Sequence, residues 1–530
     1  MCPPSRINDP DMNFQGDGMS RATTLYAYKL GIDTHQEPLV YMRTDCSICR
    51  AEGYTANTRL QIKAESGTLI ATLNTVSEEI LPPGSIGFSD SAWEFLALHH
   101  GQPVTVHHVP QVGSLSALRK KIYGHALSAD EIGSIIRDIS RRLYSDIEIA
   151  GFISACAGGR LSSEETTALT SAMAKIGNQL HWPEHEKVFD KHCIGGLPGN
   201  RTTPIVVSIV SAAGLIIPKT SSRAITSPAG TADTMEVLTN VDLTLDRLRK
   251  VITRTGACLA AGGKVGLSPT DDLLIRIERA LDLDSEGQLV ASVLSKKMAA
   301  GSTHILIDMP VGPTAKLRTQ QQAEMLAELF RVVASALGLT VRCVVTDGTE
   351  TIGNGIGPAE EARDVLSVLR NEKNAPPDLE ARALYLAGQL LSMATGADDV
   401  QALQQAREIL YSGQAWLQFR AICEAQGGLR EVPVASHHIE LRSKCAGRLH
   451  SMDNRRLAHL AKVAGAPSSP EAGLRLRVKV GDRVEAHQSL ATLYAATPGE
   501  LAYAREYFHQ NRDLFEVTAM TPIPAVERQP

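Results

Sequence analysis

The residues best suited to chemistry lie in one glycine-rich segment between Asp190 and Thr203. It reads Asp-Lys-His-Cys-Ile-Gly-Gly-Leu-Pro-Gly-Asn-Arg-Thr-Thr and runs directly into an apolar helix or strand. Glycines let a backbone approach an anion closely and turn its N–H groups inward. Lys191 and Arg201 add positive charge, while Thr202 and its neighbour stand where the start of a helix could donate further N–H groups. This segment is therefore predicted to cradle a phosphate.

A second segment, from Lys219 to Glu236, is rich in hydroxyl groups. It contains seven serine or threonine residues, Arg223 and a Gly-Thr-x-Asp turn that ends at Asp233. It follows a predicted strand, and ligands of open α/β sheets bind outside the carboxyl ends of the strands. A glycine-rich loop alone is more often a plain turn, and a serine-threonine cluster alone is more often a solvated loop. Two anion-suited segments separated by one apolar stretch favour a functional site.

The elements that must position these segments alternate between apolar runs and helical patterns. Helical patterns such as Gln320–Ala336 and Glu360–Leu369 follow or separate the apolar runs, which is typical of a mostly parallel sheet covered on both faces. Capping boxes at Ser128 and Ser162 begin two further helices, which predict a helical lobe. The runs expected as strands are Ile205–Ala213, Leu215–Ile217, Thr303–Ile307 and Leu339–Val345.

The same patterns divide the chain into an α/β protein with several parts. Residues 1–20 offer little apolar surface and are predicted to be a disordered tail. Strand-like segments between polar turns predict a β-rich N-terminal domain over 21–105. Val478–Val484 and Ser489–Tyr494 predict short strands around a Gly-Asp turn, in a C-terminal α+β domain that serves packing and interfaces. The remaining ranges are 106–176 and 265–300 for the helical lobe, 177–264 and 301–428 for the mixed or parallel-sheet α/β phosphate-binding core, and 429–530 for the C-terminal domain.

The overall composition argues against several classes of function. The chain has 530 residues, a net charge of -5 and 4% aromatic residues, so neither a basic nucleic-acid surface nor base-stacking platforms are expected. No apolar run approaches the ~20 residues of a membrane span, and the N-terminus lacks the apolar core of a secretion signal. Nine scattered cysteines suit a reducing compartment. We therefore expect a cytoplasmic protein without nucleic-acid or membrane partners.

Two motifs could suggest a metal or redox site. Cys46-Ser-Ile-Cys49 has no second cysteine pair at zinc-site spacing, and His181-Trp-Pro-Glu-His185 contains a proline. The histidine pairs at 99–100 and 107–108 have no carboxylate or cysteine pattern that completes a ligand set. We expect two ordinary thiols, a structural or surface role for the His181 motif, and neither a metal nor a cofactor.

The two anion-suited segments together resemble the thymidine and pyrimidine-nucleoside phosphorylase family. The shared motifs are Asp190-Lys-His-x-x-Gly-Gly, Ser221-x-Arg, Ala229-Gly-Thr-x-Asp-x-x-Glu, Ser292-Val-Leu-Ser-Lys-Lys and Ile307-Asp-Met-Pro-Val-Gly. The resemblance covers residues 118 to 500, roughly. An N-terminal extension, with Cys-Ile-Gly-Gly-x-Pro-Gly-Asn-Arg and Ala-Ile-Thr-Ser-Pro-Ala-Gly, is similar to the longer branch of the family, which also includes AMP phosphorylases.

The resemblance implies roles for individual residues. Cys193 stands where the shorter enzymes carry a serine, and Arg276 and Arg279 are alternative candidates for an arginine that contacts the base. His192 and Asp284 are alternative candidates for the catalytic proton donor to the base. The implied phosphate positions are Lys191, Thr203, Ser221 and Thr231, and the implied contacts to the pyrimidine ring are Ser292 and Lys296. The nucleotide contacts implied by the AMP phosphorylases are Gly196, Ser222, Arg223, Ala224, Ile225, Thr226, Ser227, Thr231, Ser292 and Lys316.

The resemblance also implies an activity, in which a pentosyl group passes from a base to inorganic phosphate. The expected reaction converts thymidine and phosphate to thymine and 2-deoxyribose 1-phosphate, with phosphate a substrate rather than a cofactor. The alternative is an AMP phosphorylase that gives free base and ribose 1,5-bisphosphate, motivated by Arg201, Lys316 and the altered Ala224–Ala229 loop. A phosphoribosyltransferase and a non-catalytic scaffold are further alternatives. The family implies a homodimer or larger homo-oligomer, with the site in a cleft between the helical lobe and the sheet.

Overall fold

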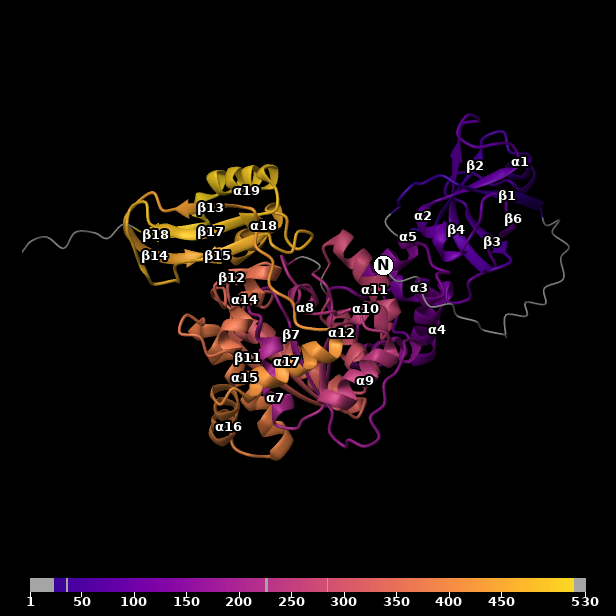
Figure 1. The fold of residues 1–530 in the computed structure, drawn as a ribbon. Helices are drawn as coiled ribbons and strands as arrows, with labels where there is room; N and C mark the ends of the chain where they lie inside the picture. Colours follow the sequence, from indigo (N-terminus) through magenta and orange to yellow (C-terminus); the bar gives the residue numbers. More distant parts are fainter. Residues whose placement is uncertain (1–22, 35–36, 225–226, 284, 519–530) are drawn as a thin grey trace, which may run out of the picture. The chain divides into compact units, whose positions relative to one another are not determined.

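The structure, a computed structural model, describes residues 23–34, 37–224, 227–283 and 285–518. The chain divides into two compact units, with the boundary between Phe152 and Ile153 (Figure 1). The tail predicted at residues 1–20 lies outside the described residues.

The first unit contains a closed barrel, drawn in indigo in Figure 1. Its strands follow the order β1-β5-β2-β4-β3-β6. Leu60 and Ile62 alternate with more exposed residues along β3 and are fully buried, as the two-residue period of a strand requires. The strand-like segments of the sequence are therefore strands of this barrel. The bounds are β1 (Thr23–Lys29), β2 (Leu39–Arg43), β3 (Arg59–Ala64), β4 (Gly67–Val76), β5 (Ser85–Phe88) and β6 (Pro103–His108).

Helices complete the first unit. The predicted capping box begins α4, where the Ser128 hydroxyl accepts from the backbone N–H of Glu131 and the glutamate accepts from that of Ser128. Cys49 is buried and its thiol donates to Met42 Sδ at 3.7 Å, and both it and Cys46 are free. Nowhere in the described parts of the chain do three potential metal ligands gather. The helices are α1 (Ser47–Glu52), α2 (Asp90–Phe95), α3 (Leu115–Ile122), α4 (Ala129–Ser140) and the first part of α5 (Asp146–Cys156).

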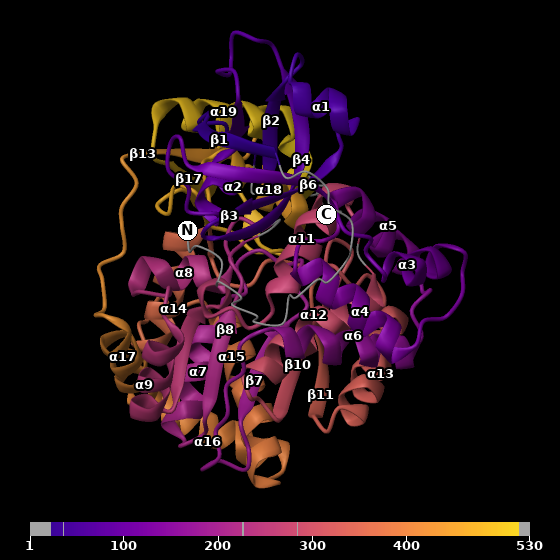
Figure 2. The same ribbon diagram turned by 90° about the vertical axis from the view of Figure 1, so that its right-hand side faces the viewer.

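A parallel sheet lies at the centre of the second unit. Its strands follow the order β11-β10-β7-β8-β9, in which a bridge between Val188 and Ile216 joins β7 to β8. Figure 2 shows β8, β7, β10 and β11 side by side. Because the strands are parallel, their carboxyl ends lie at one edge. The bounds are β7 (Phe189–Cys193), β8 (Ile217–Ser221), β9 (Ala257–Ala261), β10 (His304–Val311) and β11 (Thr340–Asp347).

Helices cover both faces of this sheet. Leu306 of β10 packs in a core cluster with α7 (Thr202–Ala212) and α15 (Pro377–Thr395). The neighbouring Ile305 and Ile307 pack in a second cluster with α12 (Glu286–Ala299) and α13 (Gln320–Ala336). This alternation confirms the predicted doubly covered α/β sheet. The other helices are α6 (Ser163–Ile176), α8 (Thr231–Leu238), α9 (Leu245–Thr255), α10 (Gly262–Val265), α11 (Pro269–Leu281), α14 (Pro358–Leu369), α16 (Asp399–Tyr411) and α17 (Gln414–Gln426).

One predicted strand is wrong and another is too long. The sequence predicts a strand over Ile205–Ala213, but Thr202–Ala212 forms α7, which is buried from Thr202 to Ser211. A helix that is apolar on every side shows no helical period and reads like a buried strand. The prediction around Val478 is also too long, because only Arg483–Val484 forms β16.

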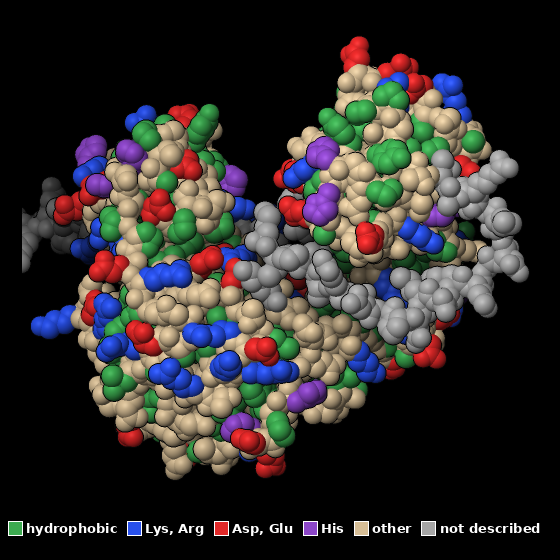
Figure 3. Space-filling model, turned by 45° about the vertical axis from the view of Figure 1, so that its right-hand side comes forward, with side chains coloured by type: hydrophobic (Ala, Val, Ile, Leu, Met, Phe, Trp, Pro, Cys, Tyr) green, Lys and Arg blue, Asp and Glu red, His purple; other side chains and the backbone are tan. Residues whose placement is uncertain are grey.

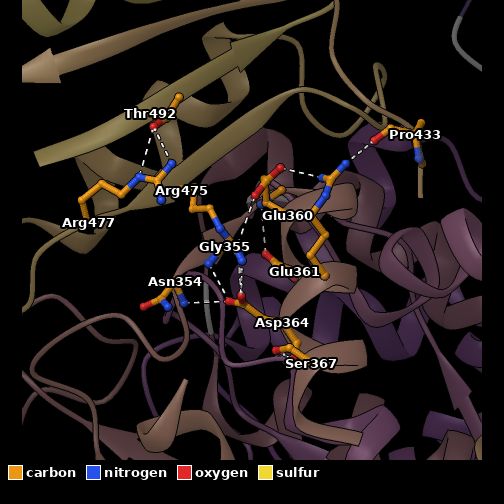
Figure 4. A network of polar contacts seen from close by, with 12 residues as sticks. Asn354, Gly355, Glu360, Glu361, Asp364, Ser367, Pro433, Arg475, Arg477 and Thr492 are labelled. Atoms are coloured by element: carbon orange, nitrogen blue, oxygen red, sulfur yellow. Dashed lines mark hydrogen bonds and ion pairs between the residues drawn. The ribbon is translucent and has the colours of Figure 1, made fainter. Parts of the chain in front are cut away.

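The C-terminal region combines two antiparallel sheets with two helices. β12 (Gly355–Ile356) precedes α14 in the α/β core, yet it pairs with β15 (Gly473–Leu476). Arg475 of β15 reaches α14, where it binds Glu360 at 3.2 Å and Asp364 at 3.1 Å (Figure 4). Figure 1 shows α19 (Pro498–Gln510) lying along the sheet. The other elements are β13 (His437–Arg442), β14 (Gly447–Met452), α18 (Asn454–Val463), β17 (Ser489–Ala495), a short 3₁₀ turn (Arg512–Leu514) and β18 (Phe515–Thr518).

The surface offers no broad apolar area on the face drawn in Figure 3, where hydrophobic side chains form small patches separated by charged and other residues. Within the described ranges, no helix is both long enough and apolar enough to cross a membrane.

Candidate active site

The carboxyl ends of β7 and β8 bring the two anion-suited segments together. β7 ends at Cys193 and leads into the glycine-rich segment, while the neighbouring β8 ends at Ser221 and leads into the hydroxyl-rich segment. Successive side chains of a strand point to opposite faces, so Asp190 and His192 share one face of β7, and Lys191 and Cys193 share the other. The two segments therefore meet at the edge where open α/β sheets hold ligands.

Lys191 is almost completely buried, with 1% of its side chain exposed. Its Nζ donates to Thr202 Oγ1 at 2.8 Å and lies 3.7 Å from Asp308 Oδ2. Thr202 is the first residue of α7, whose N-terminal N–H groups favour anions. Because the ammonium occupies an acceptor site on the Thr202 oxygen, the hydroxyl hydrogen can be donated to an anion. The predicted residue, Thr203, is also buried, but the contact with Lys191 is made by Thr202.

Asp190 is fully buried and is shared by two lysines. Lys297 Nζ lies 2.8 Å and Lys219 Nζ 3.5 Å from its carboxylate oxygens. Burial lowers the pKa of Lys219 to about 7, against the opposing effect of Asp190.

The buried cluster carries an excess of one positive charge when Lys219 is protonated. Three lysines (Lys191, Lys219 and Lys297) face two carboxylates (Asp190 and Asp308), and all five side chains are buried. Burying a charge without a partner is costly. The cluster therefore favours the binding of an anion.

His192 lies in the field of the same lysines. Burial, followed by the charges of Lys297, Lys219, Lys296 and Lys191, holds the pKa of His192 well below 6.5. The imidazole is therefore neutral at neutral pH and retains one N–H donor. Such a ring can donate a hydrogen bond to a departing base without carrying a full positive charge.

Cys193 brings a thiol into the cradle. Burial, with the nearby Asp308 carboxylate, raises the pKa of Cys193 to about 12, so the group remains a thiol. Asn200 Nδ2 donates to its Sγ at 3.5 Å. A thiol is a weak hydrogen-bond donor, so it offers an anion less than the serine of the shorter enzymes.

Gly196 is required by close backbone contact. Its φ is +86°, and a Cβ added there would lie 2.4 Å from the backbone nitrogen of Lys316. Gly199 is similarly confined, because a Cβ would lie 2.2 Å from the Ile352 carbonyl oxygen. The structure thus places Lys316, whose side chain is half-buried, beside the glycine-rich segment.

Acidic residues hold the hydroxyl-rich segment in place through hydrogen bonds and ion pairs. Asp233 Oδ2 accepts from the backbone N–H groups of Ala224 at 2.6 Å and Gly230 at 2.7 Å. Arg223 is half-exposed and binds Glu236, with Asp242 Oδ1 at 3.3 Å. Ser222 is exposed, whereas Ser221 and Ser227 are half-buried, and Ile225 and Thr226 lie outside the described residues.

Arg201 joins the two segments directly. Its Nη1 donates to Thr231 Oγ1 at 3.0 Å, and its Nη2 donates to the Ala229 carbonyl at 2.9 Å. Thr231 is the first residue of α8, as Thr202 is of α7. Each helix start therefore carries a threonine hydroxyl that accepts from a cationic side chain.

The predicted base contacts lie on α12. Ser292 and Lys296 are one helical turn apart and half-buried. Lys296 forms an ion pair with the buried Asp271 of α11. Burial alone would lower the pKa of Lys296, but the carboxylates of Asp271, Asp272 and Glu278 together outweigh burial and raise it. The second candidate for proton donor, Asp284, lies outside the described residues, and the alternative arginines are half-buried (Arg276) and exposed (Arg279) on α11.

Sequence reasoning missed several members of the site. Lys219, Asp271, Lys297 and Asp308 had no assigned role, and Thr202 was expected only at a helix start that donates N–H groups; Thr202 and Lys297 stand beside predicted residues. One signal was present, because a charged residue inside an apolar strand such as Ile-Leu-Ile-Asp-Met needs a buried partner. The partners themselves come from other elements and have no local signal.

Comparison with known proteins places this geometry in a family. Residues 115–177 match the glycosyl transferase family helical bundle domain, residues 185–416 its a/b domain, and residues 448–514 the pyrimidine nucleoside phosphorylase C-terminal domain. The chain is 52% identical to "Putative thymidine phosphorylase 1" of Acidovorax sp. (strain JS42), over 97% of this chain and 99% of the relative. The chain belongs to the thymidine and pyrimidine-nucleoside phosphorylase family. It is thus a nucleoside phosphorylase of the pentosyltransferase type.

Other relatives of this phosphorylase agree. "Putative thymidine phosphorylase" of Polaromonas sp. (strain JS666 / ATCC BAA-500) is 53% identical over 90% of this chain and 94% of the relative. Among solved structures, anthranilate phosphoribosyltransferase from Thermus thermophilus shares the fold, with a TM-score of 0.50 and 19% identity over 58% of this chain and 99% of that chain.

Proposed function

We propose that this phosphorylase cleaves thymidine with inorganic phosphate, giving thymine and 2-deoxyribose 1-phosphate. The observation that carries the proposal is the buried Lys191 ammonium bonded to the Thr202 hydroxyl at the start of α7, with Lys219 and Lys297 around the neighbouring Asp190. The names of the relatives support the pyrimidine nucleoside as substrate.

In the proposed reaction, phosphate binds against Lys191, Thr202 and Thr231. Cleavage of the N-glycosidic bond builds positive charge on the sugar, and the bound phosphate stabilises that charge and then attacks C1′. Holding both reactants converts an encounter in solution into an aligned attack. The fixed cations and hydroxyls are already oriented, so little reorganisation is needed at the moment of reaction.

The base is proposed to depart towards His192 and Lys296, which lie near each other. Negative charge that develops on the ring is offset by the Lys296 ammonium, while the neutral His192 ring donates a hydrogen bond. Ser292, one turn from Lys296, is proposed to hold the ring edge. Asp284 as proton donor remains the alternative to His192.

Two features favour a nucleoside over a nucleoside 5′-monophosphate. Arg201, which motivated a second anion site, is paired with the buried Glu361 at 2.6 Å. Arg223 is likewise bound to Glu236 and Asp242. A guanidinium already neutralised by a carboxylate attracts a further phosphate only weakly, so neither arginine supports a second phosphate site.

The decisive experiment measures base release from thymidine, uridine, cytidine, AMP, CMP and UMP, with and without phosphate. Release from thymidine that requires phosphate, with arsenate able to replace it, supports the proposal. Release confined to the monophosphates contradicts the nucleoside assignment. No phosphate-dependent release from any substrate refutes the proposed reaction.

The proposal includes two expectations about the protein in the cell. We expect a homodimer or larger homo-oligomer, which light scattering measures directly, and a cytoplasmic location.

A further inference from the structure

Arg201 uses all three of its guanidinium nitrogens for contacts within the protein. Nε lies 2.6 Å from Glu361 Oε2, and Nη2 lies 2.6 Å from the same oxygen. Nη1 donates to Thr231 Oγ1 at 3.0 Å, and Nη2 donates to the Ala229 carbonyl at 2.9 Å. The side chain is 12% exposed, so these contacts are shielded from water.

Glu361 fixes this arrangement from α14. Its carboxylate is 1% exposed and also accepts from the Gly357 backbone N–H and the Thr234 hydroxyl, both at 3.2 Å. Burial raises the pKa of Glu361, whereas Arg201 opposes that shift. If the arginine swung away to bind a ligand, it would leave this carboxylate buried without its counter-charge. Arg201 is therefore held in place rather than poised to move.

The contact between Arg201 and Thr231 determines whether the Thr231 hydroxyl donates or accepts a hydrogen bond with a ligand. A hydroxyl has one hydrogen to donate and two lone pairs that accept. Because Arg201 Nη1 donates to Thr231 Oγ1, one lone pair is occupied and the hydrogen can be donated to an acceptor such as phosphate. In the same way, Lys191 Nζ donates to Thr202 Oγ1 and forms an ion pair with Asp308.

We propose that Arg201 and Glu361 are positioning residues that orient the Thr231 hydroxyl as a hydrogen-bond donor to phosphate. This inference rests on the proposed phosphorolysis. Arg201 touches no substrate, and its effect reaches the reaction only through Thr231. The site then contains two matched units, each consisting of a buried carboxylate, a cation and a threonine at the start of a helix.

The neighbouring residue supplies a matched control. Glu360 precedes Glu361 on α14 but turns to Arg363 at 2.6 Å and to Arg475 at 3.2 Å (Figure 4). Glu360→Gln therefore makes the same chemical change in the same helix without touching Arg201.

The test compares phosphate KM, thymidine KM and kcat among Thr231→Val, the paired variant Arg201→Met with Glu361→Gln, and their combination. The paired variant removes both charges together, so no buried charge is left alone. We expect each to raise the phosphate KM about tenfold, the scale of one hydrogen bond to a charged group. The combination should raise it no further, because Arg201 acts through Thr231. Thymidine KM should stay unchanged, and Glu360→Gln should keep the wild-type phosphate KM.

Multiplied losses in the combination would show that Arg201 binds phosphate itself and would overturn the inference, as would an unchanged KM in the paired variant. The rise in Tm with phosphate concentration provides a second readout that needs no turnover. If the wild type releases no base, the proposed reaction fails, but an equal loss of this Tm rise in all three variants still supports the inference. No Tm rise in the wild type overturns it.

Discussion

Replacing Lys191 with methionine separates its role in binding phosphate from its role in the fold. The side chains have similar length, but the ammonium is lost. At 3.7 Å from Asp308 and an effective dielectric constant of about 20, the Coulomb attraction is about 4 kcal/mol. Lys191→Met therefore leaves Asp308 buried without its cation, and we expect a loss of about 3 kcal/mol of stability, with a Tm lower by several degrees.

The paired variant Lys191→Met with Asp308→Asn removes that penalty. Both charges disappear together, and the amide oxygen can still accept from the Thr346 hydroxyl, which lies 2.7 Å from Asp308 Oδ1 in the wild type. We expect most of the lost Tm to return. The net charge of the cluster is unchanged, but phosphate has lost the Lys191 ammonium and the cation that orients the Thr202 hydroxyl, so kcat/KM for phosphate should remain about 100-fold low, or about 2.7 kcal/mol.

The assay follows base release from thymidine at varied phosphate, alongside thermal unfolding of each variant. Lys187→Met serves as control, because Lys187 is exposed and donates only to the Ala394 carbonyl at 2.9 Å. Recovery of both stability and turnover in the paired variant would refute the reasoning, since Lys191 would then serve the fold alone.

Three further outcomes are expected. The pKa of His192 is depressed in the native state, so as pH falls below about 6.5 the unfolded chain takes up this proton first and the wild type loses stability. The Tm of His192→Asn should therefore fall less than that of the wild type over this range. Parallel plots of Tm against pH for the two proteins would contradict this expectation. Cys193→Ser exchanges a weak donor for a stronger one and should lower the phosphate KM about threefold, whereas an unchanged KM in steady-state kinetics would mean that this side chain does not face phosphate. Gly196→Ala should lower Tm more than Gly195→Ala, because both have positive φ but only Gly196 has a backbone atom, Lys316 N, within 3.0 Å of the added Cβ; equal losses would show that close contact does not constrain this turn.

Local features of the fold could be predicted from the sequence because their causes are local. The capping boxes at Ser128 and Ser162 mark the helix starts observed in the structure, since the cap and its glutamate are three residues apart. Gln320–Ala336 matches its helix at both ends, because its apolar face has a clear period. α7 could not be recognised, since a fully buried helix has no polar face to reveal its period.

In the active site, too, local features could be predicted from the sequence, whereas contacts between distant elements could not. The glycine-rich segment can be recognised in the sequence because backbone geometry requires glycine at Gly196 and Gly199. The ion pairs of Asp190 with Lys219 and Lys297 cannot be predicted from the sequence, because they depend on how β7, β8 and α12 pack. The sequence alone suggests Arg201 as a ligand group, since nothing near it in the chain reveals that Glu361 neutralises it.

Because of the short strand β12, the C-terminal region depends on the α/β core in a way that the N-terminal barrel does not. Every strand of the N-terminal barrel finds its partners within the barrel, which makes that barrel a self-contained module. The C-terminal sheet instead borrows Gly355–Ile356 from the α/β core and returns Arg475 to α14. A deletion that removes the C-terminal region would leave an open strand edge and would remove the cation that binds the buried Asp364. Recombination can therefore exchange the barrel between relatives, whereas the C-terminal region must be inherited together with the core.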